Sequence, residues 1–290
     1  MSETPEEKLA KCKEEHAKAS NGPGIHFNSP QTPFELVMPG GVQKFPNIYF
    51  DMTLLETMKT VTFEWRSTTR KLDLPLLEVV IDQYKPGCLN YSLDDYEIRS
   101  YAIPDPYFKF TIGKRHMLKF FYNIENSILQ IFIDGVHGLF ESLEKFEAGL
   151  LHDIVRITGD VHIDAIHVPC DTPLPLPLTV QLGNQQKMLC DIKGKKRENC
   201  SKQMSLTLGE HQVMLPLDDE VDKEDVTVKL NRCDDGKFTV TMNDAVVDVL
   251  PQENVPSKVT IKGDVDVSWV ETGASVDGAC NEATNLDKDH

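Results

Sequence analysis

The stretch from Asn90 to Arg99 combines an aromatic side chain, Tyr96, with a basic side chain, Arg99, and the acidic Glu97 lies between them. An aromatic ring can cover the apolar face of a sugar, and a guanidinium can hold a hydroxyl or a carboxylate in a planar fork. The same residues also fit an ordinary strand, in which Glu97 and Arg99 form an exposed ion pair of little energetic value. The spacing leaves both interpretations open.

His162, Asp164 and His167 form a second group, with side chains of the kind that bind metals. His162 and Asp164 are two residues apart, so they would share one face of a strand. A zinc site needs further ligands on that face, and the sequence offers no third one. We interpret these residues as solvated polar side chains on an outer sheet face.

Motifs for catalysis or for a cofactor cannot be placed on the chain. The sequence has no glycine-rich phosphate loop, no recognisable nucleophile signature and no repeated acidic calcium loop. We therefore expect a protein that is not an enzyme and that uses no cofactor or metal. Catalytic triads are defined by geometry rather than by sequence, so the sequence alone leaves catalysis open.

The charge balance restricts the possible partners. The 290 residues include 30 Lys and Arg against 46 Asp and Glu, a formal net charge of −16. This charge repels polyanions, so nucleic acid is not an expected partner. The chain has no apolar run of membrane-spanning length and no signal-peptide pattern, which predicts a cytoplasmic protein. Secretion that does not depend on a signal peptide stays open.

Both ends of the chain are polar. Residues 1–30 are expected to form a polar segment, in which Thr4-Pro5-Glu6-Glu7 has the arrangement of a helix capping box. The short helix that follows has few apolar residues and should be frayed unless a partner holds it. Residues 274–290 are acidic and rich in small residues, which predicts a disordered tail.

Short apolar runs bounded by Gly, Pro, Asn and Asp fill the rest of the chain, a pattern that predicts an all-β fold of antiparallel sandwiches. The expected strands of the first half are Ile48–Thr53, Val61–Trp65, Leu76–Ile81, Phe108–Ile112, Met117–Tyr122, Ile128–Ile133 and Ile157–Ile166. Those of the second half are Met188–Ile192, Met204–Leu208, Gln212–Leu217, Val226–Leu230, Phe238–Met242 and Val259–Val270.

Three segments recur in the same order in both halves, which indicates a duplicated domain. Ile157-Thr158-Gly159-Asp160-Val161 is matched by Ile261-Lys262-Gly263-Asp264-Val265, and Leu129 to Gly135 is matched by Phe238 to Asp244. Met117–Tyr122 resembles Asp225–Leu230 in character. Closely spaced prolines from Pro169 to Pro173 mark the boundary, so the expected domains are residues 31–169 and 170–273.

These segments resemble the galectin carbohydrate-recognition domain. Leu129-Gln130-Ile131-Phe132-Ile133-Asp134-Gly135-Val136-His137 is similar to the family's Phe-x-Val-x-Ile-Asn-Gly-x-His segment, which precedes a Gly-Asp-Val strand. Phe108 to Gly113 is similar to its Phe-Pro-Phe-x-x-Gly strand. The resemblance covers most of residues 31–168 and, more weakly, 172–271. It implies two galectin-like sandwiches of the jelly-roll or concanavalin-like kind, in the manner of a tandem-repeat galectin.

The residues with which galectins bind sugar are largely replaced. The family holds a β-galactoside with a His-x-Asn-x-Arg strand, a Val-x-Asn segment, and a Trp followed by Glu and Arg. Glu78 and Asp82 stand near the His and Arg places, and Asn90 matches the Asn of the second segment. The resemblance therefore implies an altered carbohydrate site in the first domain, formed by Asn90, Tyr96, Arg99, Glu97, Glu78 and Asp82.

The second half is too short for such a site. Only the residues from Asp218 to Asp225 separate the strand that ends at Leu217 from the next one. That length leaves no room for two binding strands and their loops. His211 lies near the place of the binding-strand His, but no Asn or Arg accompanies it. A galactoside site is therefore expected in the first half only.

The sequence is consistent with two functions. The first is a galectin-like lectin without enzymatic activity, whose first domain binds a β-galactoside or another glycan, with glycans or glycoproteins as partners. The alternative is a galectin-fold protein that has lost glycan binding and acts through protein–protein contacts. Binding to a glycan array separates the two.

Overall fold

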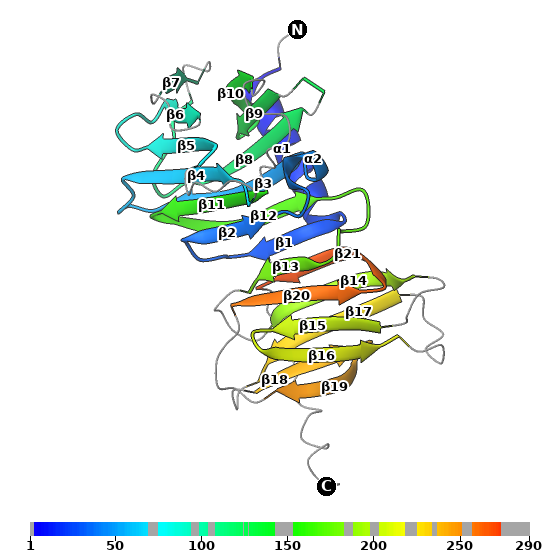
Figure 1. Ribbon diagram of the computed structural model, residues 1–290. Helices are drawn as coiled ribbons and strands as arrows, with labels where there is room; N and C mark the ends of the chain where they lie inside the picture. The colour runs from blue at the N-terminus through cyan, green and yellow to red at the C-terminus, as the bar shows by residue number, and fades with distance from the viewer. Residues whose placement is uncertain are drawn as a thin grey trace. The chain divides into compact units, whose positions relative to one another are not determined.

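The computed structural model describes residues 3–68, 75–93, 99–103, 108–123, 125–126, 128–142, 153–182, 188–197, 203–217, 225–233, 237–250 and 257–273 (Figure 1). In these ranges two helices, α1 (Pro5–Asn21) and α2 (Gly41–Lys44), accompany a chain of β-strands, which confirms the all-β fold class. The chain forms two compact units. The first contains Met1–Gly22 and Ser29–Pro169, and the second contains Pro23–Asn28 and Cys170–His290.

The first unit is a sandwich of two antiparallel sheets. One sheet has the strand order β2-β11-β4-β5-β6-β7, and the other has the order β10-β9-β8-β3-β12. The strands are β2 (Phe34–Val37), β3 (Asn47–Leu54), β4 (Thr60–Arg66), β5 (Leu77–Asp82), β6 (Cys88–Leu93), β7 (Arg99–Ala102), β8 (Arg115–Asn123), β9 (Ile128–Ile133), β10 (Val136–Ser142), β11 (Ile154–Gly159) and β12 (Val161–Pro169).

An aromatic cluster between the two sheets forms the centre of this unit. Phe50 and Phe120 of one sheet meet Phe63 and Trp65 of the other, with ring centroids 4.8 Å (Trp65 to Phe120) to 5.3 Å (Phe50 to Phe63) apart. All four side chains are almost completely buried. Successive residues of a strand point to opposite faces, so the residues between these aromatic ones face outward.

The second unit also consists of two sheets. Its strand orders are β13-β20-β15-β16 and β1-β21-β14-β17-β18-β19. The strands are β1 (Gly24–Asn28), β13 (Leu178–Gln181), β14 (Met188–Lys196), β15 (Gln203–Leu208), β16 (His211–Pro216), β17 (Asp225–Arg232), β18 (Phe238–Met242), β19 (Ala245–Leu250), β20 (Lys258–Gly263) and β21 (Val265–Thr272).

A glycine turn divides two segments that the sequence suggested were single strands. Ile157–Ile166 is split between β11 and β12, and Val259–Val270 between β20 and β21, and in each case the two strands lie in different sheets. Gly159 and Gly263 have φ of 113° and 126°. A Cβ at either glycine would lie 2.2 or 2.3 Å from a backbone oxygen, that of Thr60 or Gln203. Only glycine fits there, so the chain changes sheets at this point.

A second turn has the same geometry in both units. Asp134 and Asn243 have left-handed φ of 50°. The backbone N–H of Asp134 donates to the carbonyl of Met117, and its carboxylate accepts from the backbone N–H of Met117. Asn243 makes the same pair of bonds with Thr227. Short polar side chains tolerate this conformation and can also hold the neighbouring strand.

The expected strand Phe108–Ile112 is wrong, because this segment is irregular. Its backbone is held by scattered bonds: Phe110 N–H donates to the carbonyl of Pro86 over 2.7 Å, and Thr111 N–H donates to Nε2 of the buried His116 over 3.1 Å. With Nε2 accepting, Nδ1 of His116 donates to Asp134, 2.8 Å away. A buried side chain thus replaces the strand neighbour that the apolar pattern suggested.

The N-terminal segment is more than a solvated appendage. The predicted capping box is present, since the Thr4 side chain accepts from the backbone of Glu7 and the Glu7 carboxylate accepts from that of Thr4. The expected short helix is present as α1, and three of its residues, Cys12, His16 and Ala19, are buried. After α1 the chain forms β1, which pairs in parallel with β21.

Strand β1 completes the second unit. Ile25 and Phe27 are 1% and 2% exposed, and they pair with Val270 and Thr272 of β21. We expect a fragment of residues 170–273 to gain at least about 3 kcal/mol of unfolding free energy when residues 23–28 are attached through a flexible linker, because two large apolar side chains become buried. Urea denaturation measures the difference.

A matched fragment carries the same linker and strand with Ile25 and Phe27 both changed to Thr, and it should gain little. Equal stability of all three fragments would contradict a structural role for β1.

Candidate functional site

Three of the residues that the sequence singled out lie together on the outer face of the six-stranded sheet. In β5 the buried Leu77, Val79 and Ile81 alternate with Glu78, Val80 and Asp82, which are partly exposed. Asn90 of β6 lies directly opposite Val80, and Ser92 lies opposite Glu78. Glu78, Asp82 and Asn90 therefore share one outward face.

Hydrogen bonds hold two of these side chains in place. The Ser92 hydroxyl donates to Oε2 of Glu78 over 3.3 Å, and the Ser100 hydroxyl of β7 donates to Oδ1 of Asn90 over 2.5 Å. Asp82 lies at the end of β5, where Oδ1 accepts from the backbone N–H of Tyr84. The face thus carries two partly exposed carboxylates and the amide of Asn90, which is only 8% exposed, with the apolar Val80 between them.

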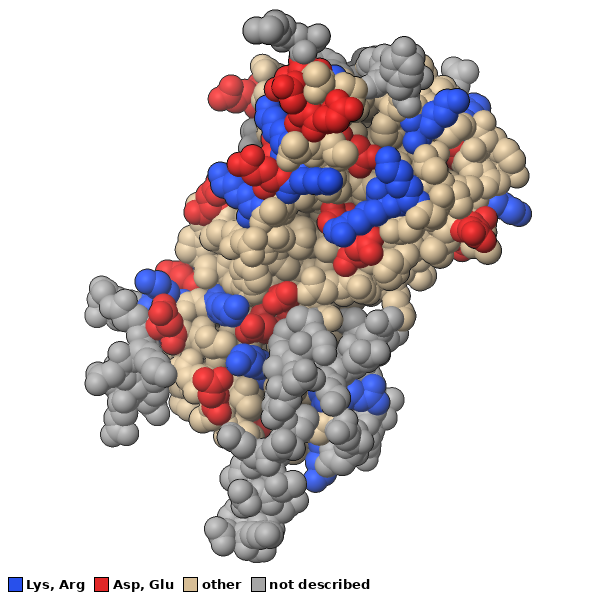
Figure 2. Space-filling view, turned by 180° about the vertical axis from the view of Figure 1, so that it is seen from behind, with Lys and Arg blue, Asp and Glu red and all other residues tan. Residues whose placement is uncertain are grey.

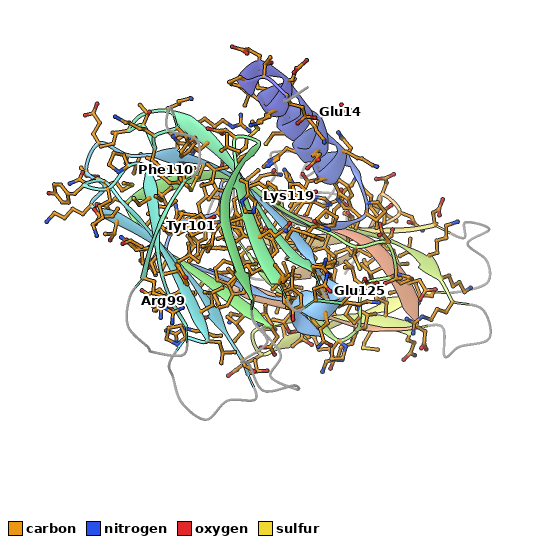
Figure 3. All side chains as sticks on the ribbon, turned by 90° about the horizontal axis from the view of Figure 1, so that it is seen from above. Glu14, Arg99, Tyr101, Phe110, Lys119 and Glu125 are labelled. Carbon is orange, nitrogen blue, oxygen red and sulfur yellow. The ribbon has the colours of Figure 1, made fainter. Side chains whose placement is uncertain are left out.

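Of the other three predicted residues, the structure describes Arg99, which it does not bring into this group. Arg99 pairs with Tyr91, whereas its neighbour Ser100 pairs with Asn90. Arg99 therefore points to the side of the sheet opposite to that of Asn90, and it is exposed because β7 is an edge strand (Figure 3). Tyr96 and Glu97 lie outside the described residues. The register places Asn90 and Arg99 on opposite sides of the sheet, which local residue spacing does not reveal.

A row of charged side chains crosses the same face. Glu64 of β4 lies opposite Glu78 on one side and Arg156 of β11 on the other. The guanidinium of Arg66 binds Glu64 through Nε at 3.0 Å and a terminal nitrogen at 2.8 Å. Glu64 is therefore compensated by Arg66. Glu78 accepts a hydrogen bond from the Ser92 hydroxyl. Its cross-strand neighbour Glu64 has the same charge, which disfavours the approach of an anion.

The second unit offers a smaller face at the equivalent place. In the described part of the chain its sheet ends at β16, where the first unit continues through β6 and β7. His211 is exposed at the start of β16, and Gln212, Met214 and Pro216 are the residues that face outward after it. No carboxylate or amide pair like that of Glu78 and Asn90 occurs on this strand.

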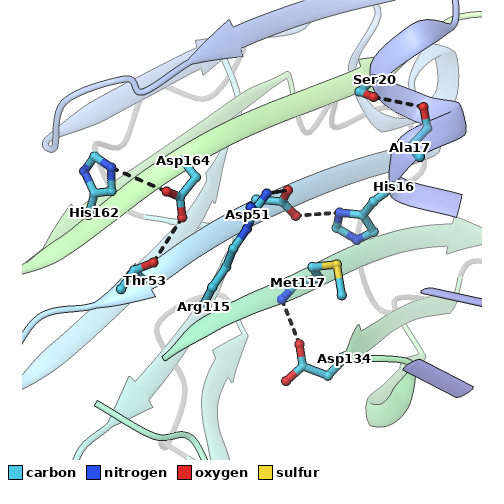
Figure 4. A network of polar contacts seen from close by, with 10 residues as sticks. All are labelled: His16, Ala17, Ser20, Asp51, Thr53, Arg115, Met117, Asp134, His162 and Asp164. Atoms are coloured by element: carbon cyan, nitrogen blue, oxygen red, sulfur yellow. Dashed lines mark hydrogen bonds and ion pairs between the residues drawn. The ribbon is translucent and has the colours of Figure 1, made fainter. Parts of the chain in front are cut away.

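A second polar group lies on the outer face of the other sheet of the first unit (Figure 4). Asp51 of β3 binds Nδ1 of His16 at 2.7 Å and also pairs with Arg115 of β8. On the same face Asp164 accepts from the Thr53 hydroxyl over 3.1 Å, and His162 Nε2 lies 3.5 Å from Asp164. The interpretation of His162 and Asp164 as outer-face residues fits this arrangement, but the sequence did not reveal that α1 supplies His16.

Burial and neighbouring charges shift the pKa values of Asp51 and His167. Burial alone would raise the pKa of Asp51, but the hydrogen bonds and charges of His16 and Arg115 outweigh it and hold the pKa below its usual value. His167 was expected to be solvated, yet it is only 7% exposed. Its burial lowers its pKa, Asp51 opposes this effect, and the charges of His16 and Arg115 add to it.

Neither metal binding nor nucleophilic chemistry finds support in this group. Among the described side chains no three His, Cys, Asp or Glu residues are arranged to hold a metal ion. Cys12 lies one helical turn before His16, in an order that suggests a thiol nucleophile. Burial, followed by the charges of Asp134 and Glu15, raises the pKa of Cys12 to about 12. The thiol is therefore protonated at neutral pH and unreactive.

The lowered pKa of His167 predicts acid sensitivity of the first unit. The folded protein disfavours the charged imidazole. The contribution of neutral His167 to the free energy of unfolding is therefore complete above about pH 6.5, the usual pKa of histidine, and it decreases as the pH falls below this value. We expect His167→Gln to reduce the loss of thermal stability between pH 7 and pH 5. Thermal unfolding followed by circular dichroism at each pH measures this loss.

The control for this experiment is His162→Gln, on the same strand. The side chain of His162 is 54% exposed, so its substitution should leave the pH dependence as in the unmodified chain. If the His167 and His162 variants respond to pH identically, the buried imidazole is not the origin of the acid sensitivity.

The surface carries charges of both signs. On the face shown in Figure 2, Lys and Arg side chains lie beside Asp and Glu side chains, without a broad basic area among the described residues. Neither described helix combines the length and the hydrophobicity that crossing a bilayer requires.

Similarity to known proteins is found among solved structures. No protein-family model matches the chain, and no curated protein matches its sequence. Among solved structures it is similar to the Caenorhabditis elegans galectin LEC-6, with 20% identity, a TM-score of 0.38, and coverage of 49% of this chain and 94% of that one. Sheep galectin-11 in complex with glycerol has 12% identity and a TM-score of 0.36, covering 48% and 98% of the two chains.

A double variant of human galectin-16 has 10% identity and a TM-score of 0.38, covering 49% and 99%. Each of these structures thus corresponds to about half of the present chain. All three are galectins, and the chain is similar to them in its β-sandwich fold.

Proposed function

We propose that the protein is a carbohydrate-binding protein without enzymatic activity, and that the outer face of β5 and β6 in the first unit binds a glycan. The observation that supports this proposal most directly is the placement of Glu78, Asp82 and Asn90 on one outward face, with Val80 between them. Carboxylates accept hydrogen bonds from neighbouring hydroxyl groups, and the amide of Asn90 both donates and accepts. An apolar patch flanked by such groups suits the two kinds of surface on a sugar ring.

The charge of this face determines which glycans it favours. Glu64 is compensated by Arg66, but among the described residues Glu78 and Asp82 receive hydrogen bonds rather than ion pairs, so a sialylated or sulfated glycan would bring a further negative charge beside these two carboxylates. A neutral glycan that donates hydroxyl hydrogens avoids this repulsion. The partners that we propose are therefore neutral glycans or glycoproteins, bound by the first unit.

Lactose should bind weakly or not at all. Glu78 and Asp82 stand near the places of the His and Arg that galectins use, and they do not reproduce those hydrogen-bond donors. A polar group buried without its partner costs about 1–3 kcal/mol. Isothermal titration calorimetry with lactose tests this expectation, and a dissociation constant in the micromolar range or lower would contradict it.

Variants of the two carboxylates identify the site. For a glycan selected on an array, Glu78→Gln and Asp82→Asn should each weaken binding by about 10- to 150-fold, because a hydrogen bond to a charged group contributes about 1.5–3 kcal/mol. Tyr96→Ala should also weaken binding if the ring stacks on the sugar. Arg99→Ala should have a smaller effect than Asp82→Asn, because Arg99 points to the other side of the sheet.

The matched control is His162→Ala, on the outer face of the other sheet, which should bind like the unmodified protein. If Glu78→Gln and Asp82→Asn also bind the selected glycan normally, the glycan site lies elsewhere. If no glycan binds, the alternative of a galectin-fold protein that acts through protein contacts is supported.

A further inference from the structure

Three turns of the chain meet at one end of the first unit, where β3 and β5 end and β4 and β8 begin. We call this end the loop end and define it as residues 54–59, 82–87 and 108–114. In Figure 1 it lies at the left of the first unit. Each segment contains a turn that is closed by a backbone N–H group donating to a carbonyl: Met58 to Leu55, Lys85 to Asp82, and Lys114 to Thr111.

The three segments of the loop end are also joined to one another. One backbone hydrogen bond links each pair of segments: Gly113 N–H to the carbonyl of Leu54 at 2.8 Å, Gln83 N–H to that of Lys59 at 3.1 Å, and Phe110 N–H to that of Pro86 at 2.7 Å. The side chains of Met58 and Phe110 are buried and anchor two of the segments, and Figure 3 labels Phe110. The tips of the three turns therefore belong to one connected surface.

This surface gathers most of the exposed apolar side chains that the structure describes. Four large apolar side chains are exposed in the described ranges: Leu55 (39%), Tyr84 (78%), Ile112 (42%) and Met214 (48%). The first three lie at the loop end, one in each segment. A single exposed apolar side chain is ordinary, but several at one place mark an interaction surface. Turns favour Gly, Pro, Asn, Asp and Ser, so the turns themselves do not require these side chains.

The charges at the loop end are mainly positive. Four lysines are exposed there, and within the described ranges none of them forms an ion pair: Lys59, Lys85, Lys109 and Lys114. The acidic side chains of the same segments are Glu56 and Asp82, and Oδ1 of Asp82 accepts from the backbone N–H of Tyr84. The loop end is therefore basic, in a chain whose net charge is −16.

Apolar side chains at the tips of turns, flanked by lysines, match the surface of a lipid bilayer. Apolar groups enter the boundary between headgroups and acyl chains, and ammonium groups meet the lipid phosphates. A tyrosine ring with its hydroxyl suits this boundary, because one end is apolar and the other polar. A bound peptide would instead need a groove or a sheet edge. Tyr84 is too exposed to line a groove, so the bilayer is the better match.

The negative net charge of the chain does not oppose this contact. At physiological ionic strength the Debye length is about 8 Å, so only the charges close to the membrane contribute strongly. At the loop end these are the four lysines, with Glu56 and Asp82. The acidic remainder of the protein is repelled by an anionic surface, which favours the orientation with the loop end toward the membrane.

We propose that the loop end binds reversibly to bilayers that contain anionic phospholipids. Leu55, Tyr84 and Ile112 enter the headgroup boundary, and the four lysines bind lipid phosphates. Stable association with a membrane requires both apolar and electrostatic contributions, and the loop end combines them. This function is additional to glycan binding, because neither the lysines nor the three apolar side chains belong to the proposed glycan site.

The first experiment measures binding of the full chain to vesicles by cosedimentation. Vesicles of phosphatidylcholine with about 30% phosphatidylserine should bind at least about tenfold more tightly than vesicles of phosphatidylcholine alone, because lysines near an anionic surface each contribute about fivefold. Raising the salt concentration should weaken the binding, since salt screens the lysines. These vesicles contain no glycan, so the result does not depend on the glycan site.

The second experiment removes two of the lysines. Lys85→Gln combined with Lys109→Gln should weaken binding to the phosphatidylserine vesicles about 25-fold, from about fivefold for each lysine. The matched control combines Lys195→Gln with Lys262→Gln, which removes two exposed lysines of the second unit and should leave binding nearly unchanged.

The third experiment tests insertion of the apolar side chains. Ile112→Ser should weaken binding at least about tenfold, because a buried apolar side chain is lost. Met214→Ser is the matched control, since Met214 is equally exposed but lies outside the loop end. Tyr84→Trp places an indole at the membrane, where its emission should shift to shorter wavelength and be quenched by lipids with brominated acyl chains.

Three results would overturn the proposal. The first is equal binding to vesicles with and without phosphatidylserine. The second is identical binding of the Ile112→Ser and Met214→Ser chains, and the third is an indole in the Tyr84→Trp chain that is neither shifted nor quenched. If heparin binds through Lys85 and Lys109 while the vesicles do not bind, the loop end recognises a sulfated polysaccharide and the membrane proposal is wrong.

Discussion

In the first unit, one side of each central strand faces a single aromatic core between the two sheets. Phe50, Phe63, Trp65 and Phe120 fill the space between the sheets, so the side chains next to them in sequence have to point outward. This constraint creates two separate outer faces with different chemistry. One carries Glu78, Asp82 and Asn90, and the other carries Asp51, Arg115 and Lys119 beneath α1.

The carboxylates on the two faces have different kinds of partner. On the first, Glu64 is compensated by Arg66, while within the described ranges Glu78 receives a hydrogen bond from the Ser92 hydroxyl. On the second, Asp51 is buried and has both His16 and Arg115 as partners. A buried carboxylate needs such compensation because desolvation penalises its charge. The charges of the second face are thus compensated from within the chain, whereas Glu78 on the first face has no ion-pair partner among the described residues.

Local sequence was sufficient for features that depend on a few neighbouring residues. The capping box at Thr4 and Glu7, the strand content and the outward positions of Glu78 and Asp82 follow from residue types at short spacing. Other features depend on residues far apart. The side to which Arg99 points is set by pairing with Tyr91, and the burial of His16 and His167 is set by a helix that packs on strands elsewhere in the chain. The apolar run at Phe108–Ile112 was misleading because His116 takes the place of a strand neighbour.

The parallel pairing of β1 with β21 joins residues from opposite ends of the chain. Gly24 lies beside Trp269, and Phe27 beside Thr272. During synthesis the ribosome makes β1 before the strands β2 to β20, and β21 emerges only after them. This pair therefore cannot form while the chain is still being extended, and its closure is a late step of folding. Until then the apolar side chains of Ile25 and Phe27 lack their β21 neighbours, so a nascent or truncated chain would be the form most exposed to aggregation and to capture by chaperones.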